Sequence, residues 1–392
     1  MPGDAASSFE QSGPGTWAGR YMRRFWQPIH LGHELGRARA RTVQVLSEEF
    51  TLFRDAEGVA HLVEARCPHR GARLALGWVE ADGIRCRYHG WKFSASGQCL
   101  EQPAEQAGFA HKVCIRSYPC VERFGIVFGF LGDGAAPPAP ELFSGVDEDL
   151  RFFHFTMVRH YNFFQDLENL VDDVHLSFLH SLSSFRDPSW GHAPPDAASV
   201  PMIEADETEF GLLQRSRCPN GKTRAVAFLM PNSVYFKTVA DRDLQGFDAI
   251  NWAIPIDDRS HMFLQLVAVP KHHTAAVEKF QRLFEQPLER GREQLLREFD
   301  AEVRAVLGGD KTLADLPKRG LETVHLEDCI MQTSQGIVAD RTRETLGRSD
   351  RAVILLRKLW TRELAALAKG ASLTPFRVSG QLPSLRRAVS AR

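Results

Sequence analysis

Two short pairs of metal-binding residues constrain this chain more than any other feature of its sequence. Cys67 and His69 stand in the stretch CPHRGARL, and Cys86 and His89 stand in CRYHGWKF, with sixteen residues between the pairs. Thiolates and neutral imidazoles are ligands for transition metals. Both pairs lie in turn-rich sequence, so chance is a poor explanation for their matched spacing. The sequence therefore predicts a metal site that is built from two loops.

Two interpretations of this site differ in how the four ligands are shared. A structural zinc ion accepts two thiolates and two imidazoles, but zinc motifs usually place both cysteines together and both histidines together. In a Rieske [2Fe-2S] centre, two cysteines hold one iron and two histidines hold the other. Each pair here contains one cysteine and one histidine, so each loop can reach both irons. The spacing favours a Rieske cluster bound by Cys67, His69, Cys86 and His89.

The residues around the pairs support the same interpretation. CPHRGARL and CRYHGWKF resemble the two loops of the Rieske domain, including the proline after the first cysteine and the Gly-Trp after the second histidine. Gly71 and Gly90 have no side chain, so the backbone can approach a cluster closely at both positions. Their N–H groups could then donate to sulfur and tune the reduction potential. The alternative is that both glycines only form turns.

Composition and charge exclude several other classes of protein. The 392 residues contain 48 Lys+Arg and 49 Asp+Glu, for a formal net charge of -1, which gives no electrostatic reason to expect nucleic acid or a membrane as a partner. The longest strongly apolar run, at 124–132, is too short to span a bilayer. The N-terminus does not have the pattern of a signal peptide. Seven cysteines argue against a disulfide framework, and we expect a cytoplasmic protein.

Patterning along the chain predicts two domains of different architecture. Residues 1–25 are predicted to be an N-terminal leader, and 26–135 an all-β domain of short strands and glycine-rich turns that contains the metal motif. Residues 136–380 mix helical and strand periodicity, which predicts an α+β catalytic domain with an antiparallel sheet flanked by helices. Within it, 183–199 is rich in proline and is expected to be a loop. Residues 381–392 are predicted to be a tail.

A second group of polar residues lies on a predicted helix at 162–181. Asn169, Asp172 and His175 recur at every third position, so they share roughly one helix face. His180 is five residues beyond His175, so both can meet one metal only if the helix ends, widens or bends between them. Two histidines and one carboxylate form the facial triad of non-haem Fe(II) oxygenases, which leaves positions open for O2.

The two motifs, in this order and about ninety residues apart, resemble those of the α subunit of Rieske non-haem iron aromatic ring-hydroxylating oxygenases. The stretches GPGTWAGRYMRRFWQPI (13–29) and EDCIMQTSQGIVADRTRETLGRSDRAV (327–353) resemble the phthalate dioxygenase-like branch of that family. The resemblance implies an N-terminal Rieske domain followed by a helix-grip-like catalytic domain. It also implies two cofactors, a [2Fe-2S] Rieske cluster and a mononuclear Fe(II).

The resemblance further implies roles for the polar residues of the 162–181 helix. In this family, an aspartate of the iron-binding helix bridges the Rieske histidine of a neighbouring subunit to an iron-ligand histidine. Asp172 fits this role because it lies three residues before His175, whereas Asp173 points elsewhere. Asn169 matches a polar position near the iron, where it is expected to support Asp172.

With His175 and His180 implied as two of the iron ligands, the third must be a carboxylate further along the chain. Glu327 and Asp328 are both candidates, and the periodicity of their helix excludes neither. The family pattern favours Asp328, which lies on an apolar stripe where a buried carboxylate needs a partner. Asp310 and Asp315 lie in loop-like sequence and fit less well. His325, one turn before Asp328, could compete as a ligand, but a position behind the ligands or on the surface fits it better.

The resemblance implies a terminal oxygenase component that hydroxylates, by mono- or dioxygenation, or O-demethylates an aromatic substrate. Electrons would come from a separate NAD(P)H-dependent flavin and iron–sulfur reductase and would cross a subunit boundary, through His89 and Asp172, in a homotrimer or stacked hexamer. Arg215, Arg217 and Lys237 are candidate partners for a carboxylate on the substrate. The alternative is a Rieske-type electron carrier without oxygenase chemistry of its own.

Overall fold

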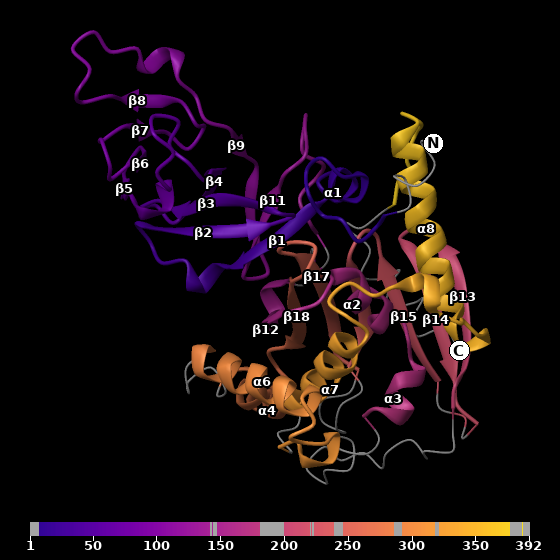
Figure 1. Ribbon diagram of the computed structural model, residues 1–392. Helices are drawn as coiled ribbons and strands as arrows, with labels where there is room; N and C mark the ends of the chain where they lie inside the picture. The colour runs from indigo at the N-terminus through magenta and orange to yellow at the C-terminus, as the bar shows by residue number, and fades with distance from the viewer. Residues whose placement is uncertain are drawn as a thin grey trace. The chain divides into compact units, whose positions relative to one another are not determined.

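The computed structural model describes residues 8–141, 143, 147–180, 200–219, 221, 223–238, 246–285, 292–317, 321–376 and 386. The chain divides into two compact units, which we call the N-terminal unit, Gln11–Pro140, and the C-terminal unit, Glu141–Arg392 together with the residues up to Glu10. Figure 1 shows the order of the elements. The predicted loop at 183–199 and, apart from Arg386, the predicted tail at 381–392 lie outside the described residues.

The described part of the predicted leader, 1–25, begins at Ser8. From Gln11 onward it belongs to the N-terminal unit, and helix α1 (Trp17–Met22) buries four of its six residues. The Thr16 side chain caps this helix by accepting a hydrogen bond from the Gly19 N–H at 3.1 Å. The predicted domain limits stay predictions.

The N-terminal unit contains three antiparallel sheets. The first has the order β1 (Trp26–Leu31), β11 (Ile126–Phe130), β10 (Cys120–Arg123). The second has the order β2 (Arg39–Val45), β3 (Glu48–Arg54), β4 (Ala60–Glu64), β9 (Ser117–Tyr118). The third has the order β5 (Trp78–Glu80), β6 (Gly83–Arg85), β7 (Lys92–Phe93), β8 (Cys99–Glu101). The strands are short, and the two loops with the metal motif follow β4 and β6.

One seven-stranded antiparallel sheet forms the centre of the C-terminal unit. Its strands, in the order of pairing, are β12 (Leu150–Arg159), β18 (His261–Pro270), β17 (Asp248–Pro255), β16 (Ser233–Lys237), β15 (Thr223–Leu229), β14 (Gly211–Arg217) and β13 (Met202–Thr208). All eight residues of β17 are buried, as expected for the central strands of a sheet covered on both faces.

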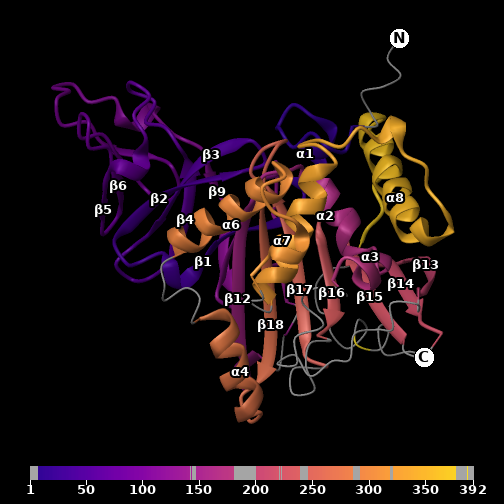
Figure 2. The ribbon, with the colours of Figure 1, turned by 60° about the horizontal axis from the view of Figure 1, so that its bottom comes forward.

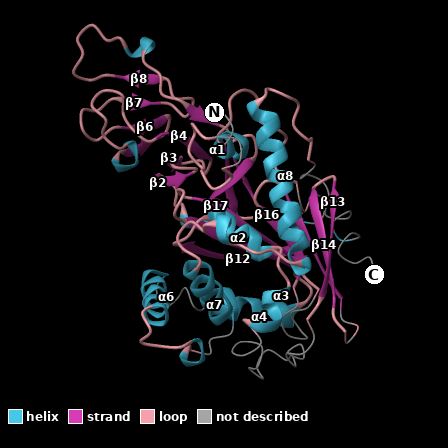
Figure 3. Ribbon diagram, turned by 45° about the vertical axis from the view of Figure 1, so that its right-hand side comes forward, coloured by secondary structure: helices cyan, strands magenta, loops and turns pink. Residues whose placement is uncertain are grey.

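Six helices accompany this sheet in the described residues (Figure 2). They are α2 (Phe163–Leu170), α3 (Val174–Phe178), α4 (Thr274–Phe284), α6 (Arg292–Leu307), α7 (Leu321–Ser334) and α8 (Arg351–Ala368). Helix α8 packs against β13 and β14 (Figure 3). Aromatic and aliphatic side chains of β12 and β18 form a shared core with α4 and α7. The predicted α+β fold class is confirmed.

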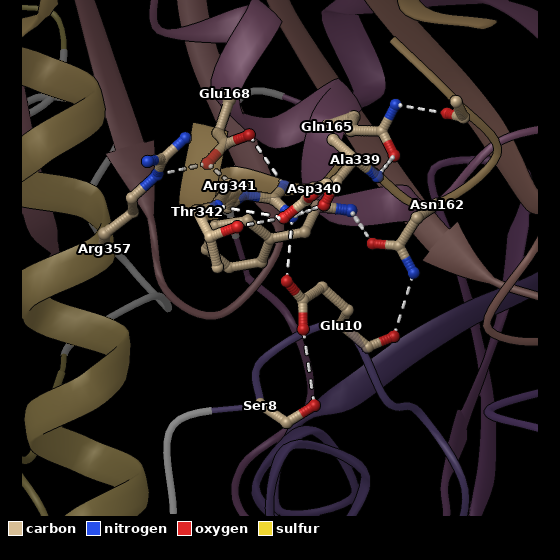
Figure 4. A network of polar contacts seen from close by, with 12 residues as sticks. Ser8, Glu10, Asn162, Gln165, Glu168, Ala339, Asp340, Arg341, Thr342 and Arg357 are labelled. Carbon is tan, nitrogen blue, oxygen red and sulfur yellow. Dashed lines mark hydrogen bonds and ion pairs between the residues drawn. The ribbon is translucent and has the colours of Figure 1, made fainter. Parts of the chain in front are cut away.

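Helix α2 carries Asn169 and is fixed by a polar network (Figure 4). Near its C-terminal end, Glu168 accepts hydrogen bonds from Arg341 at 2.8 Å and from Arg357 of α8 at 2.6 Å. Arg341 also pairs with Glu10 at 2.8 Å. The side chain of Asn162, the N-cap of α2, accepts from the Phe164 N–H at 3.0 Å. Both ends of this short helix are therefore held by partners outside it.

Helix α7 is unusual because it buries several ionisable or amide side chains beside its apolar core residues. His325, Glu327, Asp328 and Gln332 are all buried on a helix of fourteen residues. A buried polar or charged side chain is unfavourable unless it has a partner. The partners of these four side chains define the site described below. Among the described residues, no helix is both long enough and apolar enough to cross a bilayer.

Candidate active site and metal centres

The two metal-motif loops of the N-terminal unit have the same backbone geometry. The Gly71 N–H donates to the Cys67 carbonyl at 2.9 Å, and the Gly90 N–H donates to the Cys86 carbonyl at 3.0 Å. Both glycines have positive φ, 74° and 76°, where a residue with a side chain would be strained. The repeated turn explains why each loop has glycine four residues after its cysteine.

An arginine stabilises each of these turns. Arg66 donates to the Gly71 carbonyl at 3.1 Å, and Arg85 donates to the Gly90 carbonyl at 2.9 Å. Each arginine directly precedes the cysteine of its loop. Both glycine N–H groups donate to the cysteine carbonyls, and their donation to sulfur stays a prediction.

The four predicted cluster ligands lie together. Cys67 and Cys86 are each 2% exposed, and their thiols interact directly, while the backbone N–H of His69 donates to the Cys67 sulfur. The His69 and His89 rings are 4.5 Å apart between centroids. The Nδ1 atom of His69 is buried and has no hydrogen-bond partner in the described part of the chain. Trp91 stacks on His69 at 4.7 Å.

This donor set fits a cluster that takes two thiolates and two imidazoles. Burial, together with the neighbouring Cys86 sulfur, raises the pKa of the Cys67 thiol to about 11. A buried thiol of this kind keeps its proton unless a metal replaces it. The unpaired Nδ1 of His69 is likewise a buried acceptor or donor that lacks a partner in the described residues. The unpaired Nδ1 agrees with a metal-binding role for His69, and a metal bound by Cys67 would have to displace the thiol proton.

In the C-terminal unit, His175, His180 and Asp328 form a second group of possible metal ligands. One ligand atom from each lies within 4.8 Å of the other two. Asp328 Oδ1 is 3.2 Å from His180 Nε2 and 3.7 Å from His175 Nε2. Helix α3 ends at Phe178, before His180. The helix end that the spacing of the two histidines required is therefore present.

Asp328 is held in its ionised form by the two imidazoles. Burial alone would raise the pKa of this carboxyl group, but His180 and His175 outweigh it and hold the pKa well below its ordinary value. An ionised carboxylate and two imidazoles whose ligand atoms lie within 4.8 Å of one another match the donor set of the facial triad. Asp310 and Asp315, the weaker candidates, are exposed.

Glu327, the alternative to Asp328, contacts the other nitrogen of His180. Its Oε2 lies 2.6 Å from His180 Nδ1, and both side chains are 1% exposed. The group that contains both histidines includes Asp328 and does not include Glu327. Burial lowers the pKa of His180, but Asp328 and Glu327 together raise it to about 9. Sequence analysis considered Glu327 only as a ligand and missed its contact with the far side of the imidazole.

Asp172 lies beside His175, as the spacing predicted. Its Oδ2 is 3.6 Å from His175 Nδ1, and its Oδ1 accepts a hydrogen bond from the Val174 N–H at 2.8 Å. Burial would raise the pKa of Asp172, but the contact with His175 lowers it overall. Asp173 instead forms an ion pair with Arg224 of β15.

Asn169 supports Asp328, although it was expected to support Asp172. Its Nδ2 donates to Asp328 Oδ1 at 3.2 Å, and its Oδ1 accepts from Gln332 Nε2 at 2.9 Å. The reason is a break in the predicted helix: α2 ends at Leu170 and α3 begins at Val174. Asn169 and Asp172 therefore do not lie on one straight helix face.

A cavity in the C-terminal unit has the three candidate iron ligands in its wall. Including its mouth, it has an empty volume of about 1100 Å³. Most of the remaining wall is apolar and includes Phe236, Phe263, Phe280 and Phe284. Pockets of this size and composition suit small apolar molecules, and flat aromatic walls suit an aromatic ring.

The three cations that were candidates for binding a substrate carboxylate do not line this cavity. Arg215 pairs with Asp206 at 2.7 Å, and Lys237 pairs with Asp248 at 2.6 Å. Arg217 is exposed. Side chains alternate between the two faces of a strand, so Arg215 and Arg217 share the face of β14 opposite to Ser216.

The arginines that do line the cavity are Arg159 and Arg224. Arg224 lies directly opposite Ser216 in the pairing of β14 with β15, and both side chains bond the Asp173 carboxylate. Arg159 pairs with Asp166, and both side chains are almost fully buried. Each guanidinium of the cavity wall thus already has a carboxylate partner.

Comparison with known proteins agrees with this division of the chain. Residues 25–119 match the family model described as the Rieske [2Fe-2S] domain, and residues 145–374 match the one described as LigXa C-terminal domain like. The second match covers more than half of the chain. The N-terminal unit therefore contains a Rieske [2Fe-2S] domain.

Named relatives match most of the chain. It is 28% identical over 375 residues to the 5,5'-dehydrodivanillate O-demethylase oxygenase subunit of Sphingobium sp. strain NBRC 103272 / SYK-6, covering 91% of this chain and 79% of the relative. It is 27% identical over 375 residues to the phthalate 4,5-dioxygenase oxygenase subunit of Pseudomonas putida, covering 90% and 84%.

Solved structures share the fold. The terminal oxygenase of carbazole 1,9a-dioxygenase from Novosphingobium sp. KA1 superposes with a TM-score of 0.65 at 22% identity, covering 91% of this chain and 95% of that one. The similarity predicted from the two motifs is confirmed by the family models and the relatives. The chain belongs to the Rieske oxygenases with a C-terminal domain of the LigXa type, and it is a terminal oxygenase component.

Proposed function

We propose that this oxygenase component hydroxylates or O-demethylates an aromatic substrate at a mononuclear Fe(II) held by His175, His180 and Asp328. The observation that carries the proposal is the convergence of these three side chains within 4.8 Å in the wall of an apolar cavity. Two imidazoles and one carboxylate leave open positions on a ferrous ion. The aromatic wall of the cavity supports an aromatic substrate.

Two cofactors serve this reaction, and the residues of the chain fit both. When bound, the Rieske cluster relays single electrons and the ferrous ion provides the site at which O2 reacts. Cys67, His69, Cys86 and His89 would hold the cluster.

The chain's own residues orient the iron ligands. Glu327 accepts a hydrogen bond at His180 Nδ1, so that Nε2 is directed toward the metal position beside Asp328. Asn169 donates to Asp328 Oδ1, which restricts the rotation of that carboxylate. Asp172 is placed to accept a hydrogen bond from His175 Nδ1 and so to direct His175 Nε2 to the same point.

The cavity wall binds and orients the substrate. Phe263 of β18 lies on the sheet side, and Phe280 and Phe284 belong to α4. Apolar side chains from two sides favour a flat apolar ring and exclude water from the space beside the metal ligands.

Electrons come from a separate NAD(P)H-dependent flavin and iron–sulfur reductase. The relatives are named as oxygenase subunits, which implies further components in those systems. A structure similar in fold, at 18% identity and a TM-score of 0.64, is a complex between oxygenase and ferredoxin in carbazole 1,9a-dioxygenase. We infer that the electrons cross from His89 of one subunit to Asp172 of its neighbour, in a head-to-tail homotrimer or stacked hexamer.

Metal analysis of the purified protein tests this proposal. An oxygenase should contain about three irons and two sulfides per chain and show a Rieske visible spectrum, whereas an electron carrier should contain about two of each. A zinc protein should be colourless. With a reductase and NAD(P)H, the oxygenase should convert aromatic substrates, and a screen of aromatic acids and methyl ethers identifies which. A protein with two irons and no turnover would contradict the proposal.

A further inference from the structure

His325 occupies a position in the cavity wall that the proposed chemistry does not use. It lies on α7 one turn before Asp328 and is 4% exposed. Its ring stacks on Phe155 at 4.6 Å with an angle of 7° between the planes, and Phe263 lies 5.2 Å away. It is not a member of the group of possible metal ligands among the described residues. Sequence analysis considered it as a competing ligand, and the structure gives it other contacts.

The tautomer of His325 is set by Arg159. The Nη2 of Arg159 lies 3.0 Å from His325 Nδ1. A guanidinium can only donate, so Nδ1 must be the acceptor and the proton of a neutral ring must be on Nε2. Burial and the charge of Arg159 lower the pKa of His325 to about 3, so the ring is neutral near pH 7. His325 is therefore an Nε2–H donor.

Arg159 cannot easily turn away from this contact. Its Nη1 pairs with the Asp166 carboxylate, which also accepts from the Tyr161 hydroxyl at 2.8 Å and lies 3.2 Å from His261 Nε2. All of these side chains are buried. The ring of His325 is thus held by stacking on one face and by a fixed guanidinium at one nitrogen.

The Nε2–H of His325 has no partner in the described part of the chain. Its nitrogen is buried and makes no hydrogen bond there, although buried donors are nearly always paired. His325 lines the same cavity as His175, His180 and Asp328. A molecule in the cavity that carries an acceptor would supply the missing hydrogen bond within reach of the proposed reaction site.

The charged residues of the cavity wall indicate that this acceptor is uncharged. The two guanidiniums that line the cavity, Arg159 and Arg224, are each paired with a carboxylate, from Asp166 and Asp173. A substrate carboxylate would have to compete with these buried partners. An uncharged oxygen loses less solvation on entering an apolar cavity and needs only a neutral donor.

We propose that His325 binds, through Nε2–H, an uncharged acceptor oxygen on the aromatic substrate, such as the oxygen of an aryl ether. This inference rests on the proposed function, because it names the substrate class of the same cavity. It makes His325 a determinant of substrate specificity and of the orientation of the ring.

A matched pair of ligands tests the proposal. 2-Methoxynaphthalene and 2-ethylnaphthalene differ by an oxygen in place of a methylene group, and equilibrium dialysis against the reduced holoenzyme under anaerobic conditions gives both dissociation constants. His325→Asn keeps an acceptor for Arg159 and removes the distal donor, and His325→Phe keeps a ring against Phe155. In both variants we expect the preference for the ether over the ethyl compound to fall by roughly two- to tenfold, the range for one hydrogen bond.

Comparison of wild type with variant cancels the solvation of the free ligands, which is the same in both measurements. Val324→Ala is the control: Val324 also lines the cavity from α7, and its loss should weaken both ligands alike and leave the ratio unchanged. An unchanged ratio in both His325 variants, with wild type binding both ligands, would overturn the role of His325 and leave the proposed function standing. Failure of wild type to bind either ligand would overturn the aromatic site itself.

Discussion

His180 and Glu327 are joined by a buried hydrogen bond of 2.6 Å between Nδ1 and Oε2. On the other side of the same ring, His180 Nε2 lies 3.2 Å from Asp328 Oδ1. Two consecutive residues of α7 therefore contact opposite nitrogens of one imidazole. Because an ionised carboxylate can only accept, Glu327 keeps the proton on Nδ1 and leaves Nε2 as the nitrogen that can bind a metal.

Glu327→Gln should weaken iron binding without removing the site. Glutamine has the same length and can still accept from Nδ1, but it lacks the charge that favours this tautomer. We expect the affinity for Fe(II) to fall roughly 10- to 100-fold, as measured by competition with a chelator, while the cluster spectrum stays unchanged. Glu322→Gln, in the first turn of the same helix, is the matched control and should bind iron normally. Unchanged iron affinity in Glu327→Gln would exclude the orienting role.

Removal of a proposed ligand should have a larger and more selective effect. His175→Ala and Asp328→Ala should each lose the mononuclear iron and all product formation, because two ligands rarely retain a metal against solvent. The iron content should fall to about two per chain with an intact Rieske spectrum. Cys67→Ala should give the converse result, loss of the cluster absorption. Wild-type rates of product formation in His175→Ala or Asp328→Ala would remove that residue from the ligand set.

The buried pair of Asp166 and Arg159 should make stability depend on acid pH. Burial alone would raise the pKa of Asp166, but Arg159 and His261 lower it from 3.8 to about 2. A depressed pKa stabilises the folded state above the unfolded value, and this contribution, about 2 kcal/mol, is lost as the pH falls from near 4 through 2. Asp166→Asn should remove this part of the pH dependence.

The same variant should be much less stable at neutral pH. It leaves the Arg159 charge buried without its partner, which typically costs about 3–5 kcal/mol. Thermal or urea unfolding followed by intrinsic fluorescence measures the effect. Asp206→Asn is the control, because it breaks an exposed pair with Arg215 and should cost less than about 1 kcal/mol. Equal stabilities of the two variants would show that Arg159 does not depend on Asp166.

Sequence analysis identified the residues of this site from their spacing together with the family resemblance. The pairing of His175 with His180 could be predicted from spacing on one condition: histidines five positions apart can meet one metal only if the helix ends, widens or bends between them, and α3 ends at Phe178. The partner of Asn169 could not be assigned, since it depends on the break between Leu170 and Val174. No proline or glycine in residues 171–173 marks this break in the sequence.

Which polar residues line the cavity could not be predicted, for a different reason. Whether Arg215 or Arg224 faces the cavity depends on the pairing of Ser216 with Arg224 across β14 and β15. A shift of one residue in the pairing register would move every side chain of the strand to the opposite face of the sheet. Arg159 and His325 contact each other although they are 166 residues apart in the chain. No local sequence pattern predicts such a contact.

Asp172→Asn separates electron transfer from iron binding. Asparagine keeps an Oδ1 that can accept from the Val174 N–H, as Asp172 does at 2.8 Å, so the local backbone should hold its shape. The charge beside His175 Nδ1, 3.6 Å away, is lost, and with it the group proposed to join the cluster of one subunit to the iron of the next. We expect a reducible cluster, a largely occupied iron site and almost no turnover.

The defect should lie between the two centres and can be measured there. Pre-reduced Asp172→Asn protein, mixed with O2 and substrate in a stopped-flow instrument, should oxidise its cluster very slowly, while wild type does so rapidly. Asp173→Asn is the neighbouring control: it disturbs the pairing with Arg224, so it should alter substrate binding more than the rate of cluster oxidation. Rapid cluster oxidation in Asp172→Asn would show that Asp172 is not the bridge. A strictly monomeric enzyme with full activity would exclude transfer between subunits altogether, because the bridge requires two chains.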